Sequence, residues 1–291
     1  MKELARESLV SIKQILFATD FSRPSDRALP YALAIAEKYG AKLFAAHIAP
    51  EPIGLPAAAR MGLQSLGVKS QKEDRNALAE LEAQLHGVPH EILSREGDVW
   101  TEMSKITRDA AIDLIVIGTH GRTGASKLLM GSVAETIFRH APCPVLTVGP
   151  ETSGEPGSIA DLHEILFPTD FSAESLAALP YAISLAQQDD ARLYLVYVAG
   201  RSQSGETLLE SQLRNLVPPD ARLFCEPKVF VETGPPAERI LELAEELGTD
   251  LIVLGVKPTP SVFEPSAHLP QATAYKVVRQ AICPVLTVRG K

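Results

Sequence analysis

The most informative stretch of this chain reads Asp113-Leu-Ile-Val-Ile-Gly118-Thr-His-Gly121-Arg-Thr-Gly124-Ala-Ser-Lys-Leu-Leu-Met-Gly131-Ser132. Residues 114–117, directly after Asp113, are apolar and rich in β-branched side chains, which predicts a buried parallel strand. The glycine-rich part leads into a segment with helical periodicity from Val133 to His140. Glycines let backbone N–H groups approach an anion, and the unpaired amides at a helix start favour negative charge. This arrangement therefore predicts a phosphate-binding, and hence nucleotide-binding, site.

Length and composition narrow the class of protein. A chain of 291 residues predicts two domains. The net charge of −8 argues against broad nucleic-acid binding, and no apolar run reaches the roughly 18 residues that a membrane span needs. The charged N-terminus, residues 1–7, lacks an apolar signal core, so we expect a cytoplasmic protein with neither nucleic acid nor membrane as partner. The three cysteines, Cys143, Cys225 and Cys283, are expected to be reduced thiols rather than a disulfide or metal framework.

Several segments occur twice. Ile15-Leu-Phe-Ala-Thr-Asp-Phe-Ser22 recurs as Ile165-Leu-Phe-Pro-Thr-Asp-Phe-Ser172, an offset of 150. The offset is 137 between Asp113–Gly118 and Asp250–Gly255, and 140 between Cys143–Val148 and Cys283–Val288. The chain is therefore a tandem duplication, with expected domains at 1–149 and 161–291. Residues 150–160 are the expected linker, and the Pro-, Gly- and Ser-rich composition of 149–158 predicts no packed element there.

Each copy alternates predicted strands and helices. In the first copy we expect strands near 14–19, 42–48, 88–94, 113–117 and 144–148, and helices near 23–39, 70–86, 98–110 and 131–140. In the second copy we expect strands near 164–169, 192–198, 222–232, 250–254 and 284–288, and helices near 173–188, 205–216, 236–247 and 270–280. Alternating strands and helices predict an α/β fold, in which a parallel sheet carries helices on both faces. Residues 50–67 are expected to form a mobile excursion after the second strand.

The spacing of the loop glycines shows which of the known phosphate-binding motifs this loop can be. A Walker loop needs lysine directly after glycine, but Lys127 follows Ser126. A Rossmann fingerprint needs its glycines after the first strand, where Thr19 and Asp20 stand instead. The pattern present is Gly-x2-Gly-x9-Gly-Ser, ending at Ser132. Together with Asp20 and the repeated βα units, it resembles the universal stress protein family, as a tandem member, over nearly the whole chain.

That resemblance implies two flavodoxin-like (Rossmann-like) domains, each a five-stranded parallel sheet of order 3-2-1-4-5. A ligand in such a sheet binds beyond the strand ends at the switch point. The resemblance implies ATP or another adenine nucleotide, with or without a bridging Mg or Mn ion, although no carboxylate cluster is visible for a metal. The implied contacts are Ala18, Thr19 and Asp20 to adenosine, the Ile48 backbone to adenine, Gly118, Thr119, Gly121 and Arg122 along the phosphates, and Gly131, Ser132 and Val133 at the helix start.

Simpler interpretations of three of these residues stay open. Asp20 is also a suitable cap for the following helix, whose first turn carries Pro24. Arg122 also fits a solvated loop charge, and Ser132 fits both a helix N-cap and a phosphate ligand. His120 has no identifiable Ser or Cys partner, so we name no catalytic residue.

The second copy departs from the pattern in its loop. After Gly255 it carries Pro258, Pro260, Pro265 and Pro270, with no further glycine before Gly290. Proline has no N–H to donate, so we expect one competent nucleotide site per chain, in the first copy.

The function expected from these observations is that of an ATP-binding regulatory or stress-response protein with at most slow ATP hydrolysis. The alternatives are an ATPase or adenylyl- or phosphoryl-transfer enzyme, and a nucleotide-free dimerisation scaffold. The matching final strands, Val145–Val148 and Val285–Val288, are expected to pack the copies into an internal pseudo-dimer, because apolar edge strands are usually covered. We also expect a homodimer, with unknown protein partners.

Overall fold

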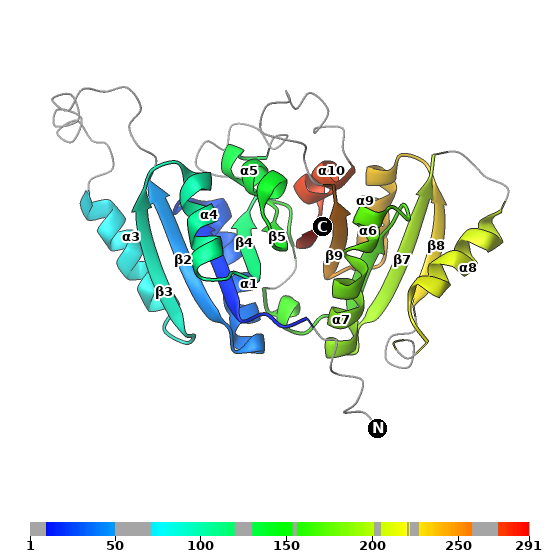
Figure 1. Cartoon of the computed structure of the whole chain (residues 1–291), viewed down its shortest axis with the longest axis horizontal. Coiled ribbons are helices and arrows are strands. Elements are labelled where there is room, and N and C mark those ends of the chain that lie inside the picture. Colours follow the sequence, from blue (N-terminus) through cyan, green and yellow to red (C-terminus); the bar gives the residue numbers. More distant parts are fainter. Residues whose placement is uncertain are drawn as a thin grey trace.

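A single sheet of ten strands runs through the computed structural model (Figure 1). The structure describes residues 10–49, 71–119, 130–153, 156–200, 205–219, 221, 227–257 and 273–290. The strand order is β3-β2-β1-β4-β5-β10-β9-β6-β7-β8. Each half therefore has the predicted order 3-2-1-4-5, and its four strand pairs are all parallel. The predicted α/β class and flavodoxin-like architecture are confirmed.

The elements of the first copy follow the predicted alternation closely. They are β1 (Gln14–Thr19), α1 (Arg23–Tyr39), β2 (Lys42–Ala49), α3 (Gln71–Gln84), β3 (His90–Glu96), α4 (Val99–Asp109), β4 (Leu114–Gly118), α5 (Ser132–His140) and β5 (Val145–Val148). Successive side chains of a strand point to opposite faces. Accordingly Ile15 and Phe17 belong to one buried cluster and Leu16 to a second, so both faces of the sheet are covered. Residues 50–67 lie outside the described residues.

The second copy repeats this order with two differences. Its elements are η1 (Pro156–Ala160), β6 (Glu164–Pro168), α6 (Ala173–Leu176), α7 (Leu179–Asp189), β7 (Arg192–Ala199), α8 (Glu206–Leu216), β8 (Lys228–Thr233), α9 (Pro236–Glu246), β9 (Leu251–Val256), α10 (Thr273–Gln280) and β10 (Val285–Arg289). The helix predicted over 173–188 is divided into α6 and α7 at Ala177 and Ala178, whereas α1 runs unbroken past Pro30, the counterpart of Pro180 in the first copy. The strand predicted from residue 222 is assigned from Lys228, with 222–226 outside the described residues.

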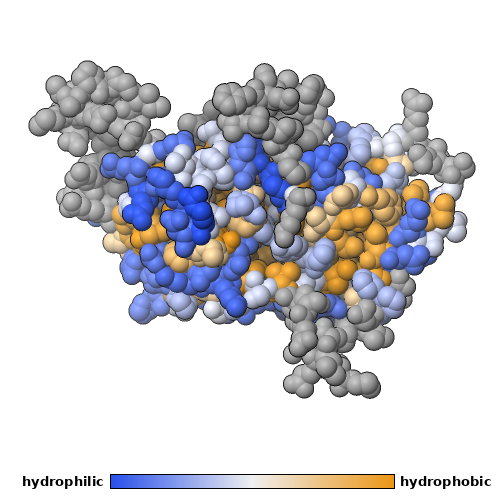
Figure 2. Space-filling model, in the orientation of Figure 1, coloured by the Kyte–Doolittle hydropathy of each residue, from blue (hydrophilic) through white to orange (hydrophobic). Residues whose placement is uncertain are grey.

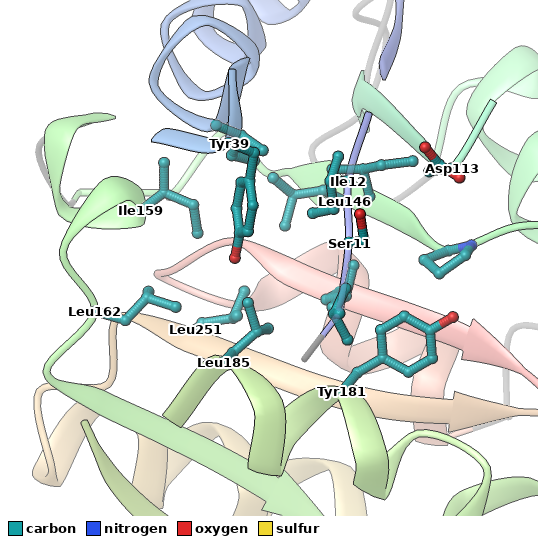
Figure 3. Close-up of a pocket in the computed structure, with 15 residues that line it drawn as sticks. Ser11, Ile12, Tyr39, Asp113, Leu146, Ile159, Leu162, Tyr181, Leu185 and Leu251 are labelled. Carbon is teal, nitrogen blue, oxygen red and sulfur yellow. The ribbon is translucent and has the colours of Figure 1, made fainter. Parts of the chain in front are cut away.

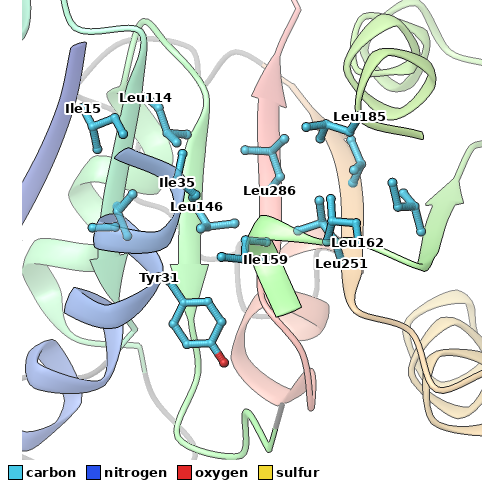
Figure 4. Close-up of a cluster of buried hydrophobic side chains, with 14 of the residues drawn as sticks. Ile15, Tyr31, Ile35, Leu114, Leu146, Ile159, Leu162, Leu185, Leu251 and Leu286 are labelled. Atoms are coloured by element: carbon cyan, nitrogen blue, oxygen red, sulfur yellow. The ribbon is translucent and has the colours of Figure 1, made fainter. Parts of the chain in front are cut away.

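The expected linker is partly a packed element, so the prediction that it packs nowhere was wrong. Pro156–Ala160 form the 3-10 helix η1, and Ile159 is only 5% exposed. Leu162, just beyond it, is fully buried. Both side chains join the apolar cluster between the copies, where Leu146 and Leu286 also meet (Figure 4). Composition did not reveal this because two apolar residues suffice when the two copies provide the surrounding core.

The two copies are joined through their final strands, as the sequence predicts. β5 and β10 pair antiparallel, with Leu146 opposite Leu286. Two threonines reinforce this seam reciprocally: the Thr147 hydroxyl donates to the Val285 carbonyl at 3.1 Å, and the Thr287 hydroxyl donates to the Val145 carbonyl at 3.2 Å. The edge strand of each copy is thereby covered by the other.

A cavity of about 170 Å³ lies at the seam, lined by both copies (Figure 3). Its wall includes Asp113 and Leu114, at the start of β4, and Leu251, at the start of β9. The cavity is therefore at the opposite end of the sheet from the strand ends where the predicted ligand would bind. The Tyr39 hydroxyl, which donates to Gln188 Oε1 at 2.5 Å, is one of its few polar groups.

The outer surface differs between the copies. In the view of Figure 2, hydrophilic residues cover much of the first copy, whereas hydrophobic residues gather over the second copy around α6 and α7. Half-buried residues of these helices include Leu176 and Ile183. Within the described residues, no helix is both long and apolar enough to cross a bilayer.

Candidate functional site at the β1–β4 switch point

The strand pairing opens where the sequence predicts the ligand. β1 pairs with β2 as far as Thr19 opposite His47, but with β4 only as far as Phe17 opposite Val116. The last residues of β1 and β4 are therefore unpaired with each other. Ligands of open α/β sheets bind at this type of switch point, beyond the carboxyl ends of the strands.

The turn after β1 is held by its own polar side chains. The Thr19 hydroxyl accepts the Phe21 N–H at 3.0 Å. Asp20 Oδ1 accepts the Ser22 N–H at 3.0 Å and the Ser25 hydroxyl at 2.8 Å, and Ser22 is the N-cap of α1. The cap of α1 is therefore Ser22 and not Asp20, which instead holds the turn before the helix. A carboxylate offers about four acceptor positions, so this role is compatible with an additional hydrogen bond to a ribose hydroxyl.

Phe21 and His47 form part of this site, and sequence reasoning missed both. Phe21 has a φ of 55°, a left-handed conformation that is strained for a bulky residue. Its ring lies 4.4 Å from that of His47, centroid to centroid. His47 is buried, and its Nδ1–H donates to the Thr19 carbonyl at 3.0 Å. The second copy has the same geometry.

In that copy Phe171 has a φ of 60°, and its ring lies 5.4 Å from that of Tyr197. The repeat contained a signal for this ring pair, because the counterpart of His47 at the offset of 150 is Tyr197, also a ring-bearing residue.

On the other side of the switch point, β4 is tied to the start of α5. Thr119 is fully buried, and its N–H donates to the Val148 carbonyl at 3.0 Å. Its carbonyl accepts the Gly131 N–H at 2.9 Å. This bond fixes the helix start against the end of β4. Gly121, Arg122 and His120 belong to residues 120–129, which lie outside the described residues.

The cap of α5 is Gly131 and not Ser132. Gly131 has φ −61° and ψ 146°, with no side-chain hydrogen bond to the helix, and Ser132 is the first helical residue. A helix leaves its first N–H groups without intrahelical partners, and the cap residue Gly131 has no side chain to accept from them. Ser132 and Val133 are exposed beside them. The N-terminus of α5 is therefore suited to an anion.

The residues implied for adenosine lie on the β1–β2 side. Ala18 and Thr19 end β1, and Ile48 follows the Thr19–His47 pair on β2. The Ile48 side chain is buried, so only its backbone is in a position to meet a base. The residues implied for phosphate, Gly118, Thr119, Gly131, Ser132 and Val133, lie at the end of β4 and the start of α5.

No metal site is apparent in the part of the chain that the structure describes. Its residues include no group of three or more His, Cys, Asp or Glu side chains that could hold an ion. Burial raises the pKa of the Asp26 carboxyl, and the negative charges of Asp20 and Glu80 raise it further.

The corresponding region of the second copy is packed differently. A Cβ at Gly255 would lie 2.1 Å from the Glu174 carbonyl oxygen and 2.4 Å from Ser175 Cα, so the backbone of α6 lies directly against the end of β9. Burial raises the pKa of Asp170, but hydrogen bonds from Ser172 and Ser175 outweigh it and leave the pKa lowered. The proline-rich loop belongs to residues 258–272, which lie outside the described residues.

Three further residues have structural roles. Burial, with Asp113 nearby, raises the pKa of Cys143 to about 12, and burial, with Asp250 nearby, raises that of Cys283 to about 12. Neither thiol is therefore a nucleophile near neutral pH. Trp100 lies in the first turn of α4, and its ring contacts that of His140 in the last turn of α5, with centroids 5.8 Å apart.

Comparison with known proteins identifies the family. The model of the universal stress protein family matches residues 11–149 and again 162–289, so the chain belongs to this family. A universal stress protein of Methanocaldococcus jannaschii is 33% identical over 138 residues, covering 47% of this chain and 81% of that protein. One from Thermus aquaticus is 33% identical over 140 residues, covering 47% and 98%.

A solved structure shares the fold over nearly the whole chain. The crystal structure of a universal stress protein from Archaeoglobus fulgidus matches with a TM-score of 0.74 and 21% identity, covering 96% of this chain and 98% of that one.

Proposed function

We propose that this chain is an adenine-nucleotide-binding stress protein with one competent site, in the first copy, and that ATP is its ligand. The observation that carries this proposal is the bond from the Gly131 N–H to the Thr119 carbonyl, because it brings a helix start whose cap residue has no side chain to the switch point. Phosphates would lie against the amides of Ser132 and Val133, and along Gly118, Gly121 and Arg122. The adenosine would lie along Ala18, Thr19, Asp20 and the Ile48 backbone.

The same proposal includes how the molecule works. Residues 1–149 and 161–291 are two universal stress protein domains that act as an internal pseudo-dimer, and nucleotide binding in the first biases conformation or partner choice. Phosphate-bridging Mg or Mn would be held mainly by the nucleotide. We also propose a homodimer, with unknown protein partners. The protein acts in the cytoplasm.

Calorimetric titration with ATP tests the site. We expect one nucleotide per chain, with binding lost in Gly131→Val and strongly weakened in Asp20→Asn. Gly131 has a backbone conformation open to any residue, so the valine variant should fold. Asparagine keeps an oxygen that can accept from Ser22 and Ser25 and removes the charge. Asp170→Asn is the matched control, because it makes the same change in the equivalent turn.

Two results would contradict the proposal. One is unchanged ATP affinity in Gly131→Val, which would show that the loop does not bind the phosphates. The other is two equivalent sites per chain, or equal effects of Asp20→Asn and Asp170→Asn. Rapid, multiple-turnover ATP hydrolysis by the purified protein would favour the enzyme alternative instead. Failure to bind any adenine nucleotide would favour the scaffold alternative.

A further inference from the structure

Arg289, the last residue of β10, reaches across the seam to the helix of the first-copy site. Its Nη2 donates to the Phe138 carbonyl at 2.7 Å, and its Nε donates to the Ala141 carbonyl at 3.3 Å. Phe138 is in the last turn of α5, and Ala141 is the C-cap residue. A helix end leaves such carbonyls without intrahelical partners, and a basic side chain can satisfy them.

The same guanidinium is also anchored within its own copy. Its Nη1 donates to the carbonyl of Lys257, which follows β9, at 3.1 Å. Burial lowers the pKa of the guanidinium, but arginine stays charged at any physiological pH. Its positive charge therefore lies at the negative end of the α5 dipole.

The first copy does not return this contact. At the offset of 140, the counterpart of Arg289 is Gly149, and the counterparts of Phe138 and Ala141 are Val278 and Ala281. A Cβ at Gly149 would lie 3.5 Å from the Ala281 carbonyl oxygen and 3.9 Å from that of Val278. The same two carbonyls of α10 thus face a residue that has no side chain. The contact runs in one direction only, from the second copy to the first.

We propose that Arg289 is a positioning residue for the phosphate site of the first copy and acts through α5. This inference rests on the proposed nucleotide function. α5 has nine residues, too few for a stable helix in isolation, so its orientation depends on its tertiary contacts. The amides at its start must converge on the phosphates, and Arg289 holds the opposite end. Without it, two carbonyls lose their partner and the helix loses a favourable charge.

The test compares ATP with adenosine as calorimetric ligands of the full chain. Adenosine would occupy only the side of the site near Asp20 and Ile48, so its affinity should not depend on α5. In Arg289→Ala we expect the dissociation constant for ATP to rise by about 5- to 30-fold, the size of a helix-terminus charge interaction, with that for adenosine unchanged. Arg289→Lys should restore part of the loss, since lysine keeps the charge but not the two-carbonyl geometry.

Two control variants separate position from charge. Gly149→Arg places the same side chain at the equivalent position, facing α10, and Arg192→Ala removes an exposed positive charge of the second copy on β7. We expect ATP affinity to be unchanged in both.

Three results would overturn the inference. If Arg289→Ala bound ATP as tightly as the wild type does, the inference would be wrong, but the proposed nucleotide site would stand. Equal weakening of ATP and adenosine would also overturn the inference, because it would show that Arg289 only supports the fold. A wild-type chain that binds neither ligand would overturn the proposed function as well, and this is seen before any variant is made.

Discussion

Gly255 stands at the end of β9, and its role is close packing rather than a special backbone angle. It has the sequence position that Gly118 has in the first copy, at the offset of 137. In the second copy the α6 backbone approaches so closely that no side chain fits there. A glycine in a phosphate-loop pattern can thus be required by helix packing alone.

Replacement of Gly255 by alanine should therefore destabilise the protein. We expect a loss of about 1–3 kcal/mol or more, as for other over-packed sites, because both the strand and the helix backbone would have to move. Urea unfolding measures this change. Gly200→Ala is the control, because no atom lies within 4 Å of a Cβ at that position, and its stability should stay within about 0.5 kcal/mol of wild type. Equal stabilities of the two variants would contradict the close contact.

We expect His140 to make the free energy of unfolding depend on pH. Burial lowers its pKa below 6.5, and the positive charges of Arg289 and Arg139 lower it further. As the pH falls below 6.5, the unfolded chain gains a proton that the folded chain does not yet bind, so this contribution to stability is present above 6.5 and is lost on acidification.

An NMR titration should therefore give a pKa for His140 below 6.5, and Arg289→Ala should raise it. His140→Gln should remove part of the loss of stability between neutral and mildly acidic pH. An unshifted His140 titration would contradict the partial burial of its ring against Trp100 and the effect of the two arginine charges.

Among the elements, α5 and η1 both depend on contacts with residues that are distant in the sequence. α5 is held at both ends by distant residues, through Thr119 at its start and Arg289 at its end. η1 lies in a stretch whose composition indicates a linker, yet Ile159 is buried among residues of both copies.

Ile159→Ala should reveal η1 as a packed element. We expect a loss of about 2–5 kcal/mol, as for other large-to-small changes in a core. Leu208→Ala on α8 is the control, because Leu208 is 64% exposed and its loss should cost no more than about 0.5 kcal/mol. Equal stabilities in urea unfolding would mean that η1 acts only as a tether.

At the scale of the whole molecule, the copies are joined by more than the pairing of β5 and β10. Lys38, at the end of α1, forms an ion pair with Asp189, at the end of α7, and the two side chains are only 15% and 6% exposed. Asp189 also accepts the Leu162 N–H at 3.3 Å. Because this polar link lies beside the seam cavity and the apolar cluster, it should help to make the copies unfold together.

A double-mutant cycle tests that link. Lys38→Met and Asp189→Asn should each cost about 3–5 kcal/mol, because each leaves a buried charge without its partner, and the double variant should cost less than their sum. The exposed pair Lys42–Glu91 is the control, with an expected coupling of about 0.2–1 kcal/mol. Additive effects of Lys38 and Asp189 would show that the copies are not coupled here.

Much of the fold could be predicted from the sequence. The duplication is evident from the repeated segments, and the alternation of β-branched strands with helical periodicity indicates the α/β class. The family resemblance then implied the strand order of each half, and two apolar edges of matching sequence indicated the seam. These features can be predicted from the sequence because each depends on local periodicity or on direct comparison of the two copies.

The tertiary structure alone decided the rest. The left-handed Phe21 against His47, the contact of α6 with Gly255, the burial of Ile159 and the reach of Arg289 to α5 all join residues from separate elements. Their pairing depends on strand register and on how far each helix shifts along the sheet. Packing across the whole core sets both quantities, and no local pattern encodes them.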